Sequence, residues 1–535
     1  MDDRISAIIV GVPFSVANAV VTIYLGMKTG LAEGIVILLL FLSASVFTLA
    51  RSLRPRTFVY LMAVVTSSTA AVIAYTDGMG AIILSGEALP APDYAMMALL
   101  GVSGIIGMLM SFYFTDYFLK RDFPWPQSRV YASIIAMLSK ERKDLQFKTS
   151  AVRMLTSGAL AGAVSFAKGT GAIPEVIGLD VAGIGLSPML IGIGMLIGFR
   201  ACLQIAIGTS ASLAIFLFLE SPGTDYVTHM RSPWIFSTAL SMMITTALIT
   251  LYIILKPAAV KALRKTSSPL DQAVVRDGGT QVRQRSNGTT LLLAAIVTIT
   301  APVLEYLISI PAWIFLLCIP ISVLFQVIES RGKAETGMSV GVSSFAVLLL
   351  IGLAFADIVP LLVLEGFVVA MILSFVLTLS TLKIAGYSDV STAELPLPLA
   401  VGSITGGIIC IPIIRILNVV YGIGTEALPA PWSVMWLEMA RSAVTHTMSP
   451  SINLYLILAG IALALLLHRY KISAITVALG LILPFSVNAT VFAGGAIAWY
   501  IGKKNWLKDD NGITASGLIA GDIIVEVATS LLSLL

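Results

Sequence analysis

Long apolar stretches separated by short polar ones occupy nearly the whole chain. Crossing the hydrocarbon core of a bilayer takes a helix of about 20 apolar residues. The pattern therefore predicts an all-α, polytopic membrane protein with about sixteen transmembrane helices, some of them broken or re-entrant. The candidate spans are residues 5–25, 32–50, 57–75, 94–119, 150–168, 181–199, 202–220, 233–255, 289–309, 311–328, 338–356, 359–380, 396–419, 451–468, 472–486, 487–502 and 512–534.

Composition supports the same class. The 535 residues are 57% hydrophobic and only 12% charged, whereas soluble domains carry about 25% charged residues. A transmembrane β-barrel is disfavoured because it would show short alternating segments. The N-terminal residues lead straight into an apolar segment without a signal-peptidase pattern, so this segment is interpreted as the first span.

Charge is unevenly distributed between the polar connections. Lys and Arg cluster around residues 51–56, 120–148, 256–285, 331–333, 469–471 and 503–508. Residues 76–93 and 421–440 hold acidic residues and prolines but no Lys or Arg. The positive-inside rule then predicts a cytoplasmic N-terminus in a multi-pass protein of the cell membrane. The net charge of +4 gives no support for nucleic-acid binding.

Two halves of the chain resemble each other. EALPAP occurs at residues 87–92 and again at 426–431, and GMKTG at 26–30 resembles GMSVG at 337–341. These matches predict an N-terminal transmembrane repeat (1–256), a basic cytoplasmic linker (257–288) and a C-terminal transmembrane repeat (289–535), with the orientation of the repeats left open. Repeated halves are common in secondary transporters, whose substrate site lies where the repeats meet.

The sequence offers no energy-coupling or cofactor motif. A GxxxxGK[ST] loop is absent, so a proton or ion gradient is the expected driving force. Cys202, Cys318 and Cys410 lie within apolar runs, and the three histidines are scattered. No cofactor or protein-bound metal is therefore expected.

Ionisable residues within apolar runs are the candidates for function, because each is costly in a membrane unless paired or hydrated. Snorkelling to the interface is an equally good explanation for Lys28, Arg200 and Lys383. Glu365, Asp522 and Glu526 lie deeper, and either line a cavity, carry protons or pair with cations. Asp522 and Glu526 share one helix face and would repel each other if both were ionised. The further candidates are Glu33, Glu175, Glu335, Asp357 and Arg415, with Asn18, Gln204, Asn418 and Asn488 as uncharged companions.

Other motifs have a structural explanation beside the functional one. The glycine-rich residues 183–198 permit close helix packing in lipid. Ser187-Pro188 and Pro484 are expected to interrupt helices, which places backbone groups beside protein or a watery cavity. Residues 121–140 predict a short amphipathic helix along the cytoplasmic interface, with Trp125 as its anchor.

Several segments, taken in order, resemble the oligopeptide transporter family, which includes the yellow-stripe-like metal-chelate transporters. They are ANAVVTIYLGMKTGL (17–31), FPWPQ (123–127), LSPMLIGIGMLIGFR (186–200), LPAP (428–431), LILPFSVNATVFAGGAIAWYIGKK (481–504) and NGITASGLIAGD (511–522). The resemblance implies sixteen spans that arose by duplication, and secondary uptake of peptides or metal chelates, usually coupled to protons. Gln127, Phe199, residues 67–71 (SSTAA) and Asp522 depart from the family pattern, which indicates a shifted substrate range.

The resulting hypothesis is a proton-coupled symporter of small peptides or peptide-like solutes that works by alternating access, and not an enzyme. The expected substrate-binding residues are Asn18, Tyr24, Lys28, Thr29, Ser187, Arg200, Thr336, Ser339, Ser486 and Asn488. Lys28 and Arg200 would hold a substrate carboxylate, and Glu365, Asp522 or Glu526 would carry the proton. A carrier of metal–chelate complexes is the main alternative, an intramembrane enzyme a remote one, and a homodimer is left open.

Overall fold

The computed structural model describes most of the chain. The described residues are 3–29, 40, 43, 54–139, 145–174, 176–178, 183–220, 229, 232–263, 287–337, 347–348, 350–425, 428, 430–445, 453–503 and 511–532. Within these ranges the side chains of some residues, including Lys28, Thr29 and Glu526, are not described. The predicted span at 32–50 and most of the predicted linker lie outside the described residues.

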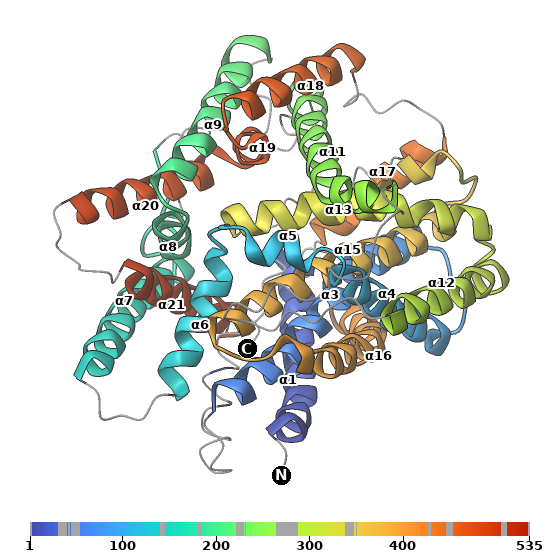
Figure 1. Cartoon of the computed structure of the whole chain (residues 1–535), viewed down its shortest axis with the longest axis horizontal. Coiled ribbons are helices and arrows are strands. Elements are labelled where there is room, and N and C mark those ends of the chain that lie inside the picture. The colour runs from blue at the N-terminus through green and yellow to red at the C-terminus, as the bar shows by residue number, and fades with distance from the viewer. Residues whose placement is uncertain are drawn as a thin grey trace.

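The protein is helical and is built from two groups of helices (Figure 1). The first bundle holds the long central helices and the N-terminus. Its elements are α1 (Asp3–Thr29), α3 (Pro55–Ser85), α4 (Asp93–Ser111), α5 (Thr115–Lys120), α6 (Pro126–Ser139), α12 (Asn287–Ile308), α13 (Ala312–Thr336), α15 (Ile358–Tyr387), η1 (Thr392–Glu394), α16 (Pro396–Tyr421) and α17 (Pro431–Val444).

The second bundle lies to the left and top of Figure 1. It comprises α7 (Leu145–Gly169), α8 (Pro188–Ile197), α9 (Phe199–Leu219), α11 (Pro233–Leu263), α18 (Leu454–Arg469), α19 (Ala474–Ile482), α20 (Phe485–Lys503) and α21 (Asn511–Leu532). A short antiparallel pair, β1 (Val176–Ile177) and β2 (Ile184–Gly185), precedes α8. Helices from the two halves of the sequence pair here: α7 with α21, α8 with α20, α9 with α19 and α11 with α18.

Ten of the described helices are long and apolar enough to cross a membrane, which confirms the polytopic helical class. The expected total of about sixteen remains a prediction, because several apolar stretches lie partly outside the described residues. Among the ten, α3 and α15 are almost entirely buried, whereas only about a quarter of the residues in α9, α12 and α20 are buried. A membrane protein exposes apolar side chains to lipid in this way, so α3 and α15 form the interior of the first bundle.

The expected helix breaks are present. Ser187 caps α8 by accepting a hydrogen bond from the backbone N–H of Leu190, and Pro188 begins the helix. Residues 483–484 separate α19 from α20. The Asn488 side chain donates to the carbonyl oxygens of Gly480 and Leu483 at 3.1 and 3.0 Å, so it satisfies backbone acceptors that the break leaves open.

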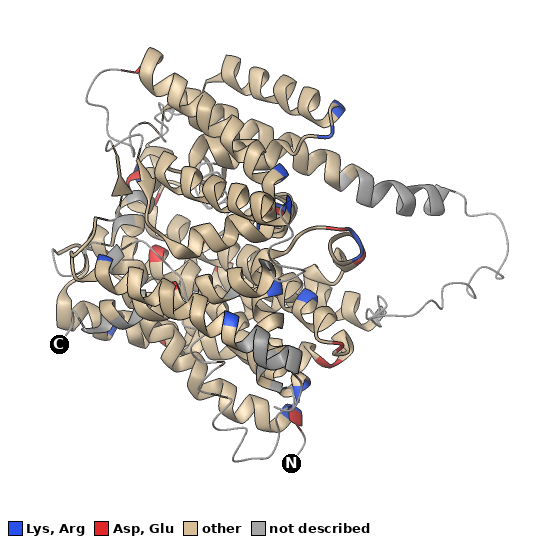
Figure 2. Ribbon diagram, turned by 90° about the vertical axis from the view of Figure 1, so that its left-hand side faces the viewer, with Lys and Arg blue, Asp and Glu red and all other residues tan. Residues whose placement is uncertain are grey.

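The Lys and Arg positions coloured in Figure 2 lie mostly in the middle and right of that view. The starts of α1 and α3 meet there, since Asp3 pairs with Arg54 and with Arg56. The far ends of the first bundle meet elsewhere, where Arg415 near the end of α16 pairs with Asp93 at the start of α4 at 2.6 Å. The helices of this bundle therefore run between two distinct faces.

Replacing Gly194 by alanine is expected to destabilise the second bundle. A Cβ atom at this position would lie 2.0 Å from the carbonyl oxygen of Val491, so α8 and α20 would have to separate. Overpacking of this kind costs about 1–3 kcal/mol. We expect a lower melting temperature in detergent than for the matched control Gly502→Ala, where no atom lies within 4 Å. Equal melting temperatures would show that α8 and α20 are not packed this closely.

Candidate functional site

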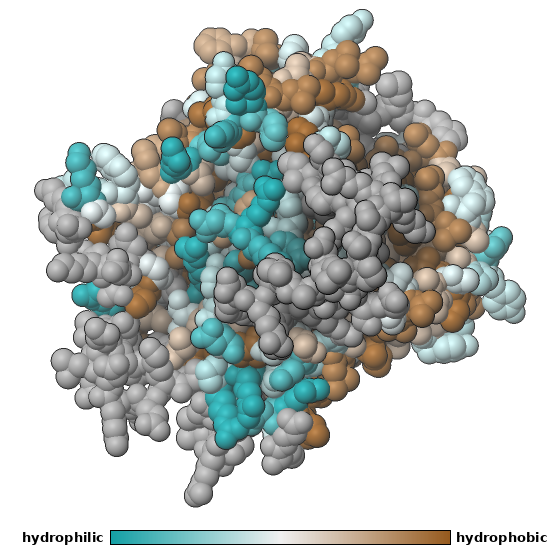
Figure 3. All heavy atoms as spheres, in the orientation of Figure 1, coloured by the Kyte–Doolittle hydropathy of each residue, from teal (hydrophilic) through white to brown (hydrophobic). Residues whose placement is uncertain are grey.

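A cavity of about 400 Å³ opens between the two bundles, and we call it the Glu335 pocket. Figure 3 shows hydrophilic residues that run from near the top to the bottom of this face, close to its middle. Every part of the pocket wall comes from a loop or a helix end. The lining residues are Asp122, Phe123, Pro124, Arg129, Leu196, Ile197, Arg200, Ala201, Gln204, Glu335, Ser473 and Thr476.

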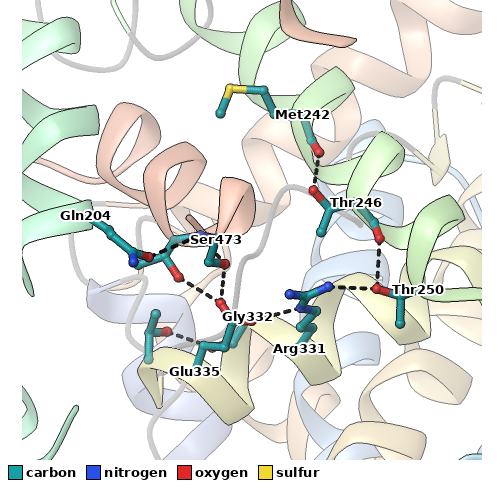
Figure 4. Close-up of polar contacts among 10 residues, drawn as sticks. Gln204, Met242, Thr246, Thr250, Arg331, Gly332, Glu335 and Ser473 are labelled. Carbon is teal, nitrogen blue, oxygen red and sulfur yellow. Dashed lines mark hydrogen bonds and ion pairs between the residues drawn. The ribbon is translucent and has the colours of Figure 1, made fainter. Parts of the chain in front are cut away.

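Glu335 lies in the last turn of α13 and connects the bundles (Figure 4). One carboxylate oxygen accepts from Arg331 Nε at 2.8 Å, one turn earlier on the same helix. The other accepts from the hydroxyl groups of Ser473 and Thr476 at the start of α19, the latter at 2.8 Å. Arg331 also donates to Thr250 on α11 at 2.8 Å. The carboxylate is therefore held by charge-assisted hydrogen bonds from both bundles.

The pocket also holds two arginines and a second carboxylate. Arg200 lies in the first turn of α9 and is exposed to the cavity. Arg129 on α6 is exposed and directs its Nε toward the Tyr387 hydroxyl at 3.4 Å. Asp122 lies in the loop between α5 and α6. A wall with two cations and two carboxylates suits a ligand that carries both charges.

The loop before α6 is fixed to α13 at the pocket edge. Trp125 lies between two prolines with a φ of 44°, and its backbone N–H donates to the carbonyl oxygen of Ala334 at 2.8 Å. Its side chain is only 1% exposed. The expectation that Trp125 anchors the chain at the membrane interface is therefore wrong: the left-handed turn directs the indole into the protein.

Asp522 lies beneath the start of α8. Its carboxylate accepts from the hydroxyls of Ser165 and Ser187, the latter at 2.8 Å, and from the backbone N–H of Met189 at 2.7 Å. Lys168 Nζ lies 4.0 Å away. The carboxylate therefore satisfies a backbone N–H that the start of α8 leaves without an intrahelical partner. Asp522 thus joins α21, α7 and α8.

Glu365 has the opposite surroundings. It lies on α15 in the interior of the first bundle and is fully buried. Neither carboxylate oxygen has a hydrogen-bond partner among the described residues. An ionised carboxylate without a partner is very costly in such a place, whereas a protonated one is tolerated.

The other expected site residues lie apart from the pocket or beside it. Asn18 donates to Thr69 on α3 at 2.9 Å, and the Tyr24 ring lies 5.9 Å from that of Tyr421. Thr336 follows Glu335, is buried and donates to the carbonyl oxygen of Gly332. Ser486 is the second residue of α20, and its carbonyl oxygen accepts from the Thr490 hydroxyl. The side chains of Lys28, Thr29 and Glu526, and the whole of Ser339, lie outside what the structure describes.

The structure thus gathers Arg200 and Gln204 with Glu335, whereas Asn18, Tyr24, Asn488 and Asp522 make their described contacts elsewhere. The sequence alone did not indicate Asp122, Arg129, Ser473 or Thr476. A weak signal existed for Ser473, because a serine directly after a basic turn and before an apolar run is a helix N-cap pattern.

A family model described as OPT oligopeptide transporter protein matches residues 5–533, nearly the whole chain. No curated protein matches the chain.

Proposed function

Because the chain belongs to the oligopeptide transporter family, we propose that it is a secondary transporter of small peptides or peptide-like solutes in the cell membrane. Membership of a transporter family supports transport and not catalysis. The observation that carries the proposal for the substrate is the Glu335 pocket, because its charges complement a zwitterion.

In this proposal Arg200 and Arg129 bind the substrate carboxylate. Guanidinium groups suit this role because their donors match both carboxylate oxygens. Glu335 or Asp122 faces the substrate ammonium group. Gln204, whose side-chain oxygen accepts from the Ser473 backbone N–H at 3.3 Å, keeps the start of α19 at the pocket wall.

Alternating access is proposed to arise from movement of one bundle against the other. The pocket lies where they meet, and its wall depends on side-chain contacts between α13 and α19 and on the helix break at Gly198 between α8 and α9. Broken helices beside a cavity are the usual site of substrate binding in secondary transporters. The face with the basic clusters is proposed to be cytoplasmic, together with the N-terminus.

Glu365 is proposed as the proton carrier. Its buried carboxyl lacks any partner among the described residues. These surroundings accept a neutral carboxyl group but make a charged one costly, so gain or loss of a proton would change the stability of this conformation. Asp522 is less suited, because hydrogen bonds from Ser165, Ser187 and the Met189 N–H already engage its oxygens. Glu526, one turn after Asp522 on α21, remains an untested candidate.

Uptake by purified protein in liposomes tests the proposed function. We expect trialanine uptake to rise when an inward proton gradient is imposed and to fall when a protonophore is added. An iron(III)–chelate complex added in parallel distinguishes the metal-chelate alternative, since it would then compete with trialanine. Uptake that is unaffected by the gradient would remove proton coupling from the proposal, and uptake of neither solute would remove the substrate class.

A further inference from the structure

Helices α1 and α13 carry the same sequence pattern in one register. Residues 13–16 (PFSV) match residues 320–323 (PISV), and residues 29–30 (TG) match residues 336–337 (TG), with equal spacing between the two motifs. In both helices the proline lies inside the helix, and the threonine is its last residue. This register places Lys28 at the position equivalent to Glu335.

The turns that contact these helix ends also match. FPWPQS (123–128) corresponds to LPAPWS (428–433). Trp125 and Ala430 both adopt left-handed backbone conformations, with φ of 44° and 47°. The Ala430 N–H donates to the carbonyl oxygen of Met27 at 2.6 Å, just as the Trp125 N–H donates to Ala334. Both acceptors lie three residues before the matched glycine.

This register differs from the one suggested by EALPAP. It pairs LPAP at 428–431 with FPWP at 123–126, and LPAP at 89–92 with LPLP at 395–398. The latter two segments precede α4 and begin α16, respectively. The order of the matched elements is then the same in both halves of the chain.

The second bundle shows the same relation between α8–α9 and α19–α20. Ser187 and Ser473 are the N-caps of α8 and α19, and phenylalanine begins both α9 and α20. At the same separation along the chain, glycine recurs at positions 194 and 480, and at 208 and 494.

The close contacts of these glycines are reciprocal. A Cβ at Gly194 would lie 2.0 Å from the Val491 carbonyl oxygen, and one at Gly480 would lie 2.1 Å from the Ile205 carbonyl oxygen. Val491 is the equivalent of Ile205 in this register. Exchanging the two halves therefore exchanges the two contacts, as a two-fold axis requires.

The equivalent ends of α1 and α13 lie at opposite faces. The end of α1 meets the end of α16 through Tyr24 and Tyr421. The end of α15, near that of α13, contacts α5 through Lys383, whose Nζ donates to the Leu119 carbonyl oxygen at 3.0 Å. Residues 388–395 connect the end of α15 to the start of α16, and α16 itself has 26 residues, about 39 Å of helix. The repeats are thus inverted.

We infer that the equivalents of the Glu335 pocket residues form a second substrate half-site at the opposite face. This inference rests on the proposed function. Lys28 corresponds to Glu335, Ser187 to Ser473, Ser486 to Arg200 and Thr490 to Gln204. In the sequence a lysine replaces the glutamate at this position, so a half-site built from these equivalents prefers the carboxylate end of the zwitterion.

The described contacts support the correspondence. At the Glu335 pocket, Gln204 reaches from α9 to the residue that caps α19. At the opposite face, Thr490 reaches from α20 to the Gly185 carbonyl oxygen at 2.7 Å, two residues before the cap of α8. Equivalent elements therefore meet at the two faces: α9 with the start of α19 at one, and α20 with the chain before α8 at the other. Ser486 is partly exposed beside the second contact.

Cysteine labelling in intact cells and in inverted vesicles tests the half-site. We expect Ser486→Cys to react with a membrane-impermeant maleimide from the outside only, and Gln204→Cys from the inside only. Trialanine is expected to slow labelling of Ser486→Cys. Cys202, Cys318 and Cys410 are buried, and unsubstituted protein gives the background.

A kinetic test examines Lys28 itself. Lys28→Glu is expected to raise the KM for trialanine about tenfold, since a charge-assisted hydrogen bond is lost, and Lys28→Arg is expected to restore it. Unchanged KM, or labelling of both cysteines from one side, would overturn the half-site while leaving uptake by the unsubstituted protein intact. If each cysteine reacts only from its expected side, but trialanine is neither taken up nor protective against labelling, the proposed substrate would be overturned instead.

Discussion

Replacing Glu335 by glutamine is expected to reduce kcat/KM for trialanine roughly ten- to hundredfold, because a charge-assisted contact to the substrate ammonium is worth about 1.5–3 kcal/mol. The same change removes the partner of Arg331, which is only 18% exposed. Breaking a largely buried ion pair costs about 3–5 kcal/mol, so a lower melting temperature is expected as well. Liposome uptake and thermal melting measured on the same preparation give both quantities.

A second variant separates folding from transport. Removing both partners is less costly than leaving one charge unpaired, so Arg331→Gln combined with Glu335→Gln is expected to recover most of the melting temperature without recovering uptake. Glu305→Gln is the matched control, because this glutamate is exposed on α12 and is not among the residues that line the pocket. Recovery of uptake by the double variant would show that Glu335 only stabilises the fold.

Apolar runs predicted the helices well, because lipid imposes length and hydrophobicity on every span. The breaks at Ser187-Pro188 and Pro484 were predictable for a similar local reason, since proline removes a backbone donor. Trp125 was misplaced because its environment depends on Ala334, which is distant in sequence and supplies the carbonyl that fixes the turn. The enrichment of tryptophan at membrane interfaces is a statistical rule, and it takes no account of a long-range contact such as the one between Trp125 and Ala334.

The pocket was only partly predictable. Arg200 and Glu335 were noticeable as charges near apolar runs, but Ser473 and Thr476 are ordinary polar residues until the fold brings them to Glu335. The converse holds for Asp522, whose position within an apolar run suggested proton coupling. Its contacts with Ser187 and Met189 instead support an anchoring role for α8.

Replacing Glu365 by glutamine is expected to abolish the response of uptake to a proton gradient. Glutamine has nearly the same shape as the protonated carboxyl and cannot lose a proton, so the transport cycle would proceed without proton movement. Because the side chain is fully buried and unpartnered among the described residues, the neutral amide is expected to change the free energy of unfolding by no more than about 1–2 kcal/mol. Exchange of labelled for unlabelled trialanine is expected to persist at a reduced rate.

Asp522→Asn provides the contrast that makes the Glu365 result specific. Its carboxylate accepts from the Met189 backbone N–H and from two serines, so loss of its charge is expected to release the start of α8, lower the melting temperature and reduce exchange and gradient-driven uptake together. Glu365→Gln should abolish gradient-driven uptake but retain exchange, whereas Asp522→Asn should reduce both. If Glu365→Gln still accumulates trialanine against a gradient in response to a pH step, the coupling proton binds elsewhere, and Glu526 becomes the next residue to replace.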